Sequence, residues 1–393
     1  MNCRLLLCII VILWPIANLL GGECIWQKEI ACDSNLGCFP GTVSTDVKGN
    51  KLVILGATIR NDVGEENLVL WEIDPNANIL HQTQIGATPK GSATIPLFHR
   101  FRDIFIKNDN QITILGDFDV NTPSSLLTIS RGGGNKSIKS ITKSRNKYEN
   151  ILISRMDSTN DSVVLAGRQE NNGLLIKLDA LGNEVWKKTF DIGETEVFTD
   201  VAVESDEIYV AGFTAPIRAP NKMGFGSEVQ NFLLLYDTNG QLIKENYFEG
   251  VFSTKLPQVA RLKSGTVLVA YDKSKNVTAV DLNVRAYSSD LKPLWETQMV
   301  KAGGGGPPGC FRIVAVSGDR AFVGVVFNGG ELVIAECASD GKVIERWTLG
   351  KTVGPHGGLH LAELDRRVYA IFGTPSYGNF QNVKTMILAF PIK

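Results

Sequence analysis

LVILGA (Leu52 to Ala57) is a short apolar run that ends in small residues, and the chain repeats this pattern along its length. Successive runs begin about 45 to 60 residues apart, so the chain consists of repeated supersecondary units. Six related runs follow the first: ITILGD (Ile112 to Asp117), VVLAGR (Val163 to Arg168), IYVAGF (Ile208 to Phe213), VLVAYD (Val267 to Asp272), AFVGVV (Ala321 to Val326) and VYAIFG (Val368 to Gly373).

The second half of most units is a pair of apolar strands around a tight turn. Asp, Asn and Gly supply the positive φ angles or side-chain hydrogen bonds that such turns need. Together with a preceding strand and the small-ended run, each unit therefore contains four short strands. The paired strands are LVLWEIDPNANIL (Leu68 to Leu80), LLIKLDALGNEVW (Leu174 to Trp186), FLLLYDTNGQLIK (Phe232 to Lys244), VRAYSSDLKPLW (Val284 to Trp295) and LVIAECASDGKVIERW (Leu332 to Trp347).

Four-stranded units joined head to tail favour a β-propeller. One such sheet cannot bury both of its faces alone, whereas radial packing stacks each sheet on its neighbours. No apolar stretch keeps a 3.6-residue period for long enough to form a long helix. Strands near the axis are crowded, which explains the small residues that end the apolar runs. Trp186, Trp295 and Trp347 are expected to fill the wider gaps between blades at the rim.

The two ends of the chain predict how the ring closes. The last unit, Leu359 to Lys393, has three strands and lacks the fourth, while IWQKEI (Ile25 to Ile30) resembles the fourth strand VWKKTF (Val185 to Phe190). We therefore predict an all-β fold, a single seven-bladed β-propeller of four-stranded antiparallel blades, closed by an N-terminal strand that completes the last blade. A β-sandwich or an irregular two-domain fold is the alternative. The blade count depends on His99 to Asn146, where the pattern is weakest.

LDALGNEVWKK (Leu178 to Lys188) has the pattern apolar-Asp-turn-Gly-x-x-x-Trp. This pattern resembles the repeats of pyrroloquinoline-quinone-like (PQQ-like) β-propellers. The resemblance covers most of the chain as a repeat style, and the motif is complete in only one or two blades. It implies an exported bacterial propeller, either a quinone-dependent dehydrogenase or a non-enzymatic outer-membrane scaffold, and it does not choose between the two.

Met1 to Gly22 has the composition of a secretory signal peptide, with Arg4 before an apolar core that runs from Leu5 to Leu20. We predict that residues 1–22 are removed and that residues 23–393 form a single domain. The protein is then secreted or periplasmic, with no transmembrane segment. A retained signal anchor is the alternative. A lipid-linked Cys24 is disfavoured, because Glu23 stands where a small residue is expected.

Charge and cysteine content narrow the function classes. The chain has 40 basic and 41 acidic residues, a balance that gives no general affinity for nucleic acid. The basic run KSIKSITKSRNK (Lys136 to Lys147) is interpreted as a solvated strand edge, with a polyanion site as the alternative. Export permits disulfides among the cysteines outside the signal peptide, in a pairing that the sequence leaves open. Cys337 is expected to be a buried free thiol.

The inner strands, aligned on the small-ended runs, place one polar residue from each of six units at the mouth of the central channel. Such a ring could bind a small polar ligand or a metal, and the alternative is that these are ordinary hydrated strand ends. His356 and His360 are speculative metal ligands, although the glycines between them argue against the helix that would bring them together. The six ring candidates are Asp103, Asn150, Asp200, Gln258, Arg312 and His360.

Three loops on the same face have distinctive sequences, and one of them, VGPHGGLH (Val353 to His360), carries His356 and His360. TAPIRAPNKMGFGSEVQ (Thr214 to Gln230) is the longest insertion, and long, partly apolar loops on a rigid scaffold are frequent contact elements. KAGGGGPPGC (Lys301 to Cys310) lacks the GK[ST] ending and the following helix of a phosphate-binding loop. The residues of the insertion predicted to contact a partner are Arg218, Lys222, Met223 and Phe225.

No catalytic motif stands out in the sequence, since no serine lies in a GxSxG-like elbow and no calcium loop is complete. We therefore expect a non-enzymatic binding or assembly scaffold that contacts another protein or a small polar ligand through its loop face. A quinoprotein-like oxidoreductase or metal-dependent enzyme with its site at the channel mouth is the alternative. A carbohydrate-binding propeller would need exposed aromatic side chains, for which Phe225 and Tyr377 are the only obvious candidates. The cofactor, if any, is unknown.

Overall fold

The computed structural model describes residues 26–30, 36–46, 49–60, 65–87, 101–108, 111–116, 125–130, 136–141, 151–158, 162–215, 228–251, 257–273, 280–302, 310–316, 319–327, 331–351, 359–373 and 384–392. These residues form strands β1 to β28, arranged as seven antiparallel sheets of four strands each. The predicted all-β, seven-bladed propeller is therefore confirmed. Within the described ranges, the chain has no helix long and apolar enough to span a bilayer.

Blades 1 to 3 are built from consecutive strands in chain order. Blade 1 consists of β2 (Leu36–Asp46), β3 (Lys51–Arg60), β4 (Glu65–Ile73) and β5 (Ile79–Ala87). Blade 2 consists of β6 (Phe101–Asn108), β7 (Gln111–Gly116), β8 (Ser125–Ser130) and β9 (Lys136–Ser140). Blade 3 consists of β10 (Ile151–Ser158), β11 (Ser162–Gln169), β12 (Asn172–Asp179) and β13 (Glu184–Phe190).

Blades 4 to 6 follow the same plan, and blade 7 combines both ends of the chain. Blade 4 consists of β14 (Thr195–Glu204), β15 (Glu207–Ala215), β16 (Glu228–Asp237) and β17 (Leu242–Val251). Blade 5 consists of β18 (Gln258–Arg261), β19 (Val267–Asp272), β20 (Val280–Tyr287) and β21 (Pro293–Ala302). Blade 6 consists of β22 (Cys310–Val316), β23 (Arg320–Val326), β24 (Glu331–Ala338) and β25 (Val343–Lys351). Blade 7 consists of β26 (His360–Leu364), β27 (Arg367–Gly373), β28 (Thr385–Pro391) and β1 (Trp26–Ile30).

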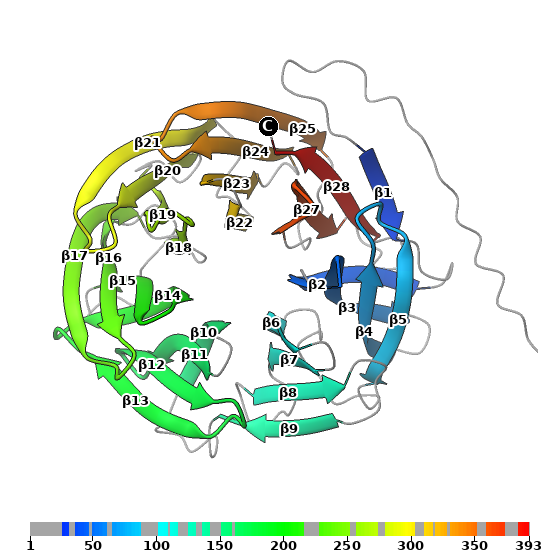
Figure 1. Ribbon diagram of the computed structural model, residues 1–393, viewed down its shortest axis with the longest axis horizontal. Helices are drawn as coiled ribbons and strands as arrows, with labels where there is room; N and C mark the ends of the chain where they lie inside the picture. Colours follow the sequence, from blue (N-terminus) through cyan, green and yellow to red (C-terminus); the bar gives the residue numbers. More distant parts are fainter. Residues whose placement is uncertain are drawn as a thin grey trace, which may run out of the picture.

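The blades stand around a central channel, with the first strand of each blade innermost and the fourth at the rim (Figure 1). The antiparallel order puts the connections between first and second and between third and fourth strands at one end of the sheets. We call this end the turn face. The opposite end, the loop face, carries the connections between second and third strands and those that lead to the next blade. The core lies in the seams between blades, as where Trp71 of blade 1 packs with Tyr369 and Ile387 of blade 7.

β1 closes the ring by pairing antiparallel with β28 (Figure 1). Trp26 pairs with Ala389, which pairs with Tyr369, the second residue of the last small-ended run. Trp186 pairs with Lys177, which pairs with Val164, again the second residue of its run. Trp26 and Trp186 therefore occupy equivalent positions in their blades, as the similar strand sequences indicated. The predicted closure is confirmed for Trp26–Ile30.

The turns between third and fourth strands use the residue types that the sequence indicated. In blade 3, Asp179 Oδ1 accepts hydrogen bonds from the main-chain N–H groups of Leu181 and Asn183 at 2.8 and 2.7 Å. Gly182 completes this turn with a φ of 75°, a conformation that glycine adopts without a steric penalty. Hydrogen bonds from Asn183 lower the pKa of the Asp179 carboxyl, because they stabilise the charged form.

Two of the three predicted rim tryptophans occupy the same register position. Trp186 donates its indole N–H to the carbonyl of Thr238 at 2.9 Å, and Trp295 donates to the carbonyl of Ser339 at 2.7 Å. Each acceptor belongs to a turn of the next blade. Trp347 differs, because it lies two positions further along its strand, is buried, and stacks on Phe322 with ring centroids 5.8 Å apart. It fills a seam, but it is not an equivalent of the other two.

Several other predictions concern parts of the chain that the structure describes incompletely. The predicted signal peptide, residues 1–22, lies outside the described residues, so export and the domain boundary stay predictions. Cys38 is disulfide-bonded, whereas Cys337 is a free thiol, as expected, and its burial raises its pKa to about 12. The first part of the basic run forms β9, the outer strand of blade 2, as expected for a strand edge.

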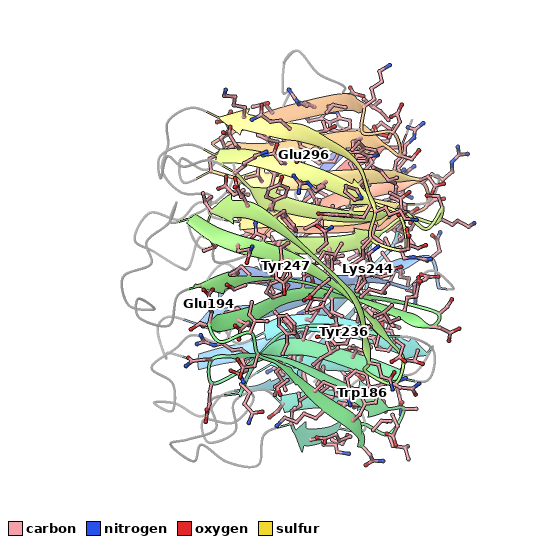
Figure 2. The ribbon with its side chains drawn as sticks, turned by 90° about the vertical axis from the view of Figure 1, so that its left-hand side faces the viewer. Trp186, Glu194, Tyr236, Lys244, Tyr247 and Glu296 are labelled. Atoms are coloured by element: carbon pink, nitrogen blue, oxygen red, sulfur yellow. The ribbon has the colours of Figure 1, made fainter. Side chains whose placement is uncertain are left out.

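A charged cluster joins blades 4 and 5 at the rim. Glu296, labelled in Figure 2, accepts hydrogen bonds from Lys273 Nζ at 2.9 Å and from Arg285 Nε at 2.9 Å. The Arg285 guanidinium lies over the ring of Phe248, a residue of blade 4, at 5.2 Å from its centroid. Although burial opposes ionisation, hydrogen bonds from Lys273, Arg285 and Tyr271 lower the pKa of Glu296 to about 2.

Replacing Glu296 by Gln should therefore lower the free energy of unfolding at pH 7 by an amount that shrinks in acid. Because the folded-state pKa lies below the unfolded value of about 4.3, the carboxylate stabilises the fold above that value. This contribution is lost as the pH falls toward about 2. Urea unfolding of wild type and Glu296→Gln between pH 2 and 7 measures it. The exposed control Glu249→Gln should leave the stability at pH 7 nearly unchanged, and a pH-independent difference for Glu296→Gln would contradict the assignment.

Candidate functional site

Five of the six predicted ring residues occupy one register position on the inner strands. Asp103 pairs with Leu115, Asp200 with Ala211, Gln258 with Ala270, Arg312 with Gly324 and His360 with Ile371. Each partner lies within the small-ended run of its blade. The alignment made on these runs therefore brings the five residues to one level of the channel.

Blade 3 departs from this alignment. Asn150 lies outside the described residues, and the equivalent position in β10 belongs to Arg155, which pairs with Ala166. Arg155 precedes its small-ended run by eight residues, as Asp200 and His360 precede theirs, whereas Asn150 precedes the same run by 13 residues. In blade 1, the same position belongs to Thr42, which pairs with Leu55. Neither Arg155 nor Thr42 was predicted. The spacing to the small-ended run could have indicated Arg155, whereas Thr42 lies ten residues before its run, further than the eight or nine of the other ring positions.

The ring acceptors bond to the neighbouring blade. Asp200 Oδ2 accepts a hydrogen bond from the main-chain N–H of Val259 at 3.0 Å. Gln258 Oε1 accepts one from the N–H of Ile313 at 3.1 Å. Each donor is the residue that follows the ring position of the next blade. The side chain of one inner strand thus holds the backbone of the next inner strand.

Blades 2 and 3 are joined in the same way, since Asp103 Oδ2 accepts from the N–H of Met156 at 3.2 Å. The junction of blades 3 and 4 is displaced by two residues. Arg155 has no acceptor atom in its side chain, and Asp157 instead accepts from the N–H of Val203 at 2.6 Å. Four consecutive junctions, from blade 2 to blade 6, therefore carry one kind of hydrogen bond between inner strands.

Three residues of the polar ring, Asp103, Asp200 and Gln258, therefore have a structural role. Each accepts a main-chain N–H that would otherwise be left unpaired between two blades. His360 is 6% exposed, so it too lies within the packed wall of the channel. Ligand binding by the six ring residues stays a prediction that these contacts do not test.

The predicted contact and metal residues lie largely outside the described part of the chain. This applies to Arg218, Lys222, Met223 and Phe225 of the long insertion, and to His356. Among the described residues, no three His, Cys, Asp or Glu side chains are grouped so that they could hold a metal ion. The pairing of His356 with His360 as metal ligands is untested.

A buried carboxyl at the loop-face end of blade 4 was not anticipated from the sequence. Glu196 is fully buried, and its Oε1 accepts hydrogen bonds from the main-chain N–H groups of Glu194 and Ile192 at 3.1 and 3.4 Å. Its Oε2 has no hydrogen-bond partner among the described residues. Burial raises the pKa of Glu196 despite the two N–H groups. The segment GETEVF shows no pattern that would reveal this.

Comparison with known proteins supports the fold and nothing finer. No protein-family model matches the chain, and no curated protein matches its sequence. The polysaccharide lyase Uly1 is similar in structure, with a TM-score of 0.56, 8% identity, and 90% of each chain covered. The WD40 domain of Toxoplasma gondii coronin gives a TM-score of 0.52 at 8% identity, covering 95% of this chain and 88% of the coronin chain.

A third similar structure is BBS1N in complex with ARL6DN, with a TM-score of 0.52, 12% identity, and coverage of 93% of this chain and 96% of that chain. At such low identities, the likeness establishes a shared propeller fold alone. By their names, one of the three is an enzyme and another was crystallised with a partner, so the fold does not select a function. The resemblance to PQQ-like repeats is supported only at the level of the propeller.

Replacing Asp200 by Ala should lower the free energy of unfolding by about 1–3 kcal/mol, because the N–H of buried Val259 would lose its acceptor. Asp206→Ala removes the same charge from an exposed position in the same hairpin and should cost less than about 0.5 kcal/mol. Denaturant unfolding of the two variants measures the difference. Equal losses would contradict the role assigned to the inner-strand hydrogen bonds.

Proposed function

We propose that the chain is an exported, non-enzymatic binding or assembly scaffold that contacts its partner through the loop face. In this proposal, the segment between β15 and β16 supplies the main contact, and the partner is another protein. The propeller provides a rigid support, and the loops on it provide specificity.

The construction of blade 4 beneath that segment is the observation that carries the proposal. β15 and β16 remain paired as far as Thr214 and Gln230. Phe213, Ala215 and Val229 form a small core of their own at this end of the blade. The hydroxyl of Thr214 donates a hydrogen bond to the carboxylate of Glu194, which Figure 2 shows on the opposite side of the disc from Trp186 and Lys244. The insertion therefore starts and ends on a packed base.

The hydrogen bonds between inner strands also favour a scaffold. They fix neighbouring blades to each other along the channel wall from blade 2 to blade 6. A frame of this kind keeps the loops of several blades in constant relative positions, so a partner can contact them without ordering the frame on binding. BBS1N, which has a similar fold, was crystallised in complex with another protein.

Replacement of residues 216–227 by a short Gly-Ser linker should abolish partner capture and leave the thermal midpoint unchanged. Chemical cross-linking on the producing cells, followed by co-purification and mass spectrometry, compares this variant with the wild type. The matched control replaces residues 303–309, a second loop on the same face, by the same linker. It should retain the partner that the wild type captures.

The enzyme alternative predicts a different result from the same preparations. A monomer without any partner that carries a stoichiometric chromophore or metal would contradict the scaffold proposal. An absorption spectrum and elemental analysis detect such a group. Its loss in Arg312→Ala or His360→Ala would place it at the channel mouth.

A further inference from the structure

A cleft of about 230 Å³ lies between blades 2 and 3. Phe105, Leu126, Val163 and Leu178 form its apolar wall, and the turn after β12 forms one side of it. Many of its lining residues lie at the beginnings of second strands, at the end of β12 or in the turn that follows it, so the cleft lies toward the turn face. It is separate from the loop face, and therefore from the surface of the proposed function.

The cleft lies beside a register position at which other blades have a tryptophan, although His81, Lys244 and Glu345 occupy it in blades 1, 4 and 6. Ser137 pairs with Thr128, which pairs with Thr113, the second residue of its small-ended run. This is the register position that Trp186 occupies in blade 3 and Trp295 occupies in blade 5. At those two seams, an indole ring covers the turn of the next blade. At the seam between blades 2 and 3, an exposed serine stands in its place.

The turn on the other side of the cleft is of the kind that receives the ring elsewhere. In blade 4, the N–H of Gly240 bonds to the carbonyl of Asp237 at 3.0 Å, and in blade 3 the N–H of Gly182 bonds to the carbonyl of Asp179 at 2.9 Å. Ala180 corresponds in this turn to Thr238, whose carbonyl accepts the indole N–H of Trp186.

The surroundings of the turn glycines differ between the seams: an indole ring lies beside Gly240 and beside Gly341, and none from the described residues lies beside Gly182. A Cβ atom placed on Gly240 would lie 3.1 Å from the ring of Trp186, and one on Gly341 would lie 2.7 Å from the ring of Trp295. At Gly182, the nearest atom is Cδ of Lys139 at 3.4 Å, and no aromatic ring is within 4 Å. The glycine surface that faces an indole ring in blades 4 and 6 is therefore contacted here, among the described residues, only by the Lys139 side chain.

One contact of the strand that contains Ser137 recurs in β1. Lys139 Nζ donates a hydrogen bond to Asn183 Oδ1 at 2.8 Å, and the closing strand β1 makes the same contact from Lys28 to Asn78 at 2.9 Å. The seam between blades 2 and 3 thus shares this contact with the seam between blades 7 and 1.

We propose that this cleft binds a tryptophan side chain presented by a partner polypeptide. The chain itself places indole rings at the same position in two other seams, which specifies the chemistry of the occupant. A cavity of about 150 Å³ is enough for benzene, so 230 Å³ admits a bicyclic ring. β9 is the outermost strand of blade 2 and has no neighbour on its outer side among the described strands. An extended polypeptide can therefore lie along the rim and insert its ring from there.

Methyl NMR of the full chain, with ¹³C-labelled leucine and valine methyl groups, tests this proposal. The probe is the peptide acetyl-Gly-Ser-Trp-Ser-Gly-amide, and the control peptide has alanine in place of tryptophan. The tryptophan peptide should cause saturable shifts in the methyl groups of Leu126, Val163 and Leu178, and the alanine peptide should cause none. Absence of these shifts at millimolar peptide would overturn the proposal.

Three variants separate this site from unspecific binding. Ser137→Trp should fill the cleft from within the chain, raise the thermal midpoint and abolish the shifts, and Ser137→Tyr serves as a second filling variant. Lys244→Trp introduces the same residue at the equivalent position of blade 4, where the Lys244 ammonium already contacts the carbonyl of Asp290. It should leave the shifts intact.

Shifts that persist in the well-folded filling variants would refute the site. N-acetyl-tryptophanamide that binds as tightly as the peptide would refute a polypeptide occupant.

Discussion

The pairing of β1 with β28 is the interaction on which the rest of the structure depends. Seven sheets can bury both faces only as a closed ring, and the ring closes where the two ends of the chain share a sheet. Without β1, blade 7 would expose the edge of β28 and lose Ile30, which is buried against blade 1. The ion pair between Lys384 and Glu29 adds a contact across this junction, at 2.6 Å. Because the ring is closed, the two blades at any other seam cannot move apart without displacing their neighbours.

Closure also explains why the same contacts recur around the ring. Near the axis, an Asp or Gln side chain of one blade holds an N–H group of the next. At the rim, a donor on the fourth strand reaches the turn of the next blade, as in Trp186, Trp295 and Lys244. Where the sequence departs from the repeat, the fold either moves the contact or leaves a space. Asp157 provides the acceptor that Arg155 cannot provide, whereas no aromatic ring of the described residues lies against Gly182 in the seam beside Ser137.

The architecture could be predicted from the sequence because it depends on local patterns. The small-ended runs, the Asp-containing turns and the likeness of the N-terminal strand to Val185–Phe190 are all contained in short segments. The contacts between blades could not be predicted, because they join residues from different repeats whose relative height depends on bulges. Trp347 was grouped with Trp186 although it lies two positions further along its strand. Arg155 is different, because its spacing of eight residues to the small-ended run is that of Asp200 and His360, so the sequence did contain a signal for it. The cleft could not be predicted, because a serine in a lysine-rich strand does not indicate that other blades have an indole ring at this position.

Amide hydrogen exchange of β28, followed by mass spectrometry, tests the central role of closure most directly. It compares a chain that begins at residue 23 with one that begins at residue 31 and so lacks β1. We predict that Thr385–Pro391 exchanges much faster in the shorter chain, that the seams on both sides of blade 7 lose protection, and that β10 to β13 on the far side of the ring lose less. A synthetic peptide of residues 23–34 should restore the protection. Equal exchange of Thr385–Pro391 in the two chains would contradict the account.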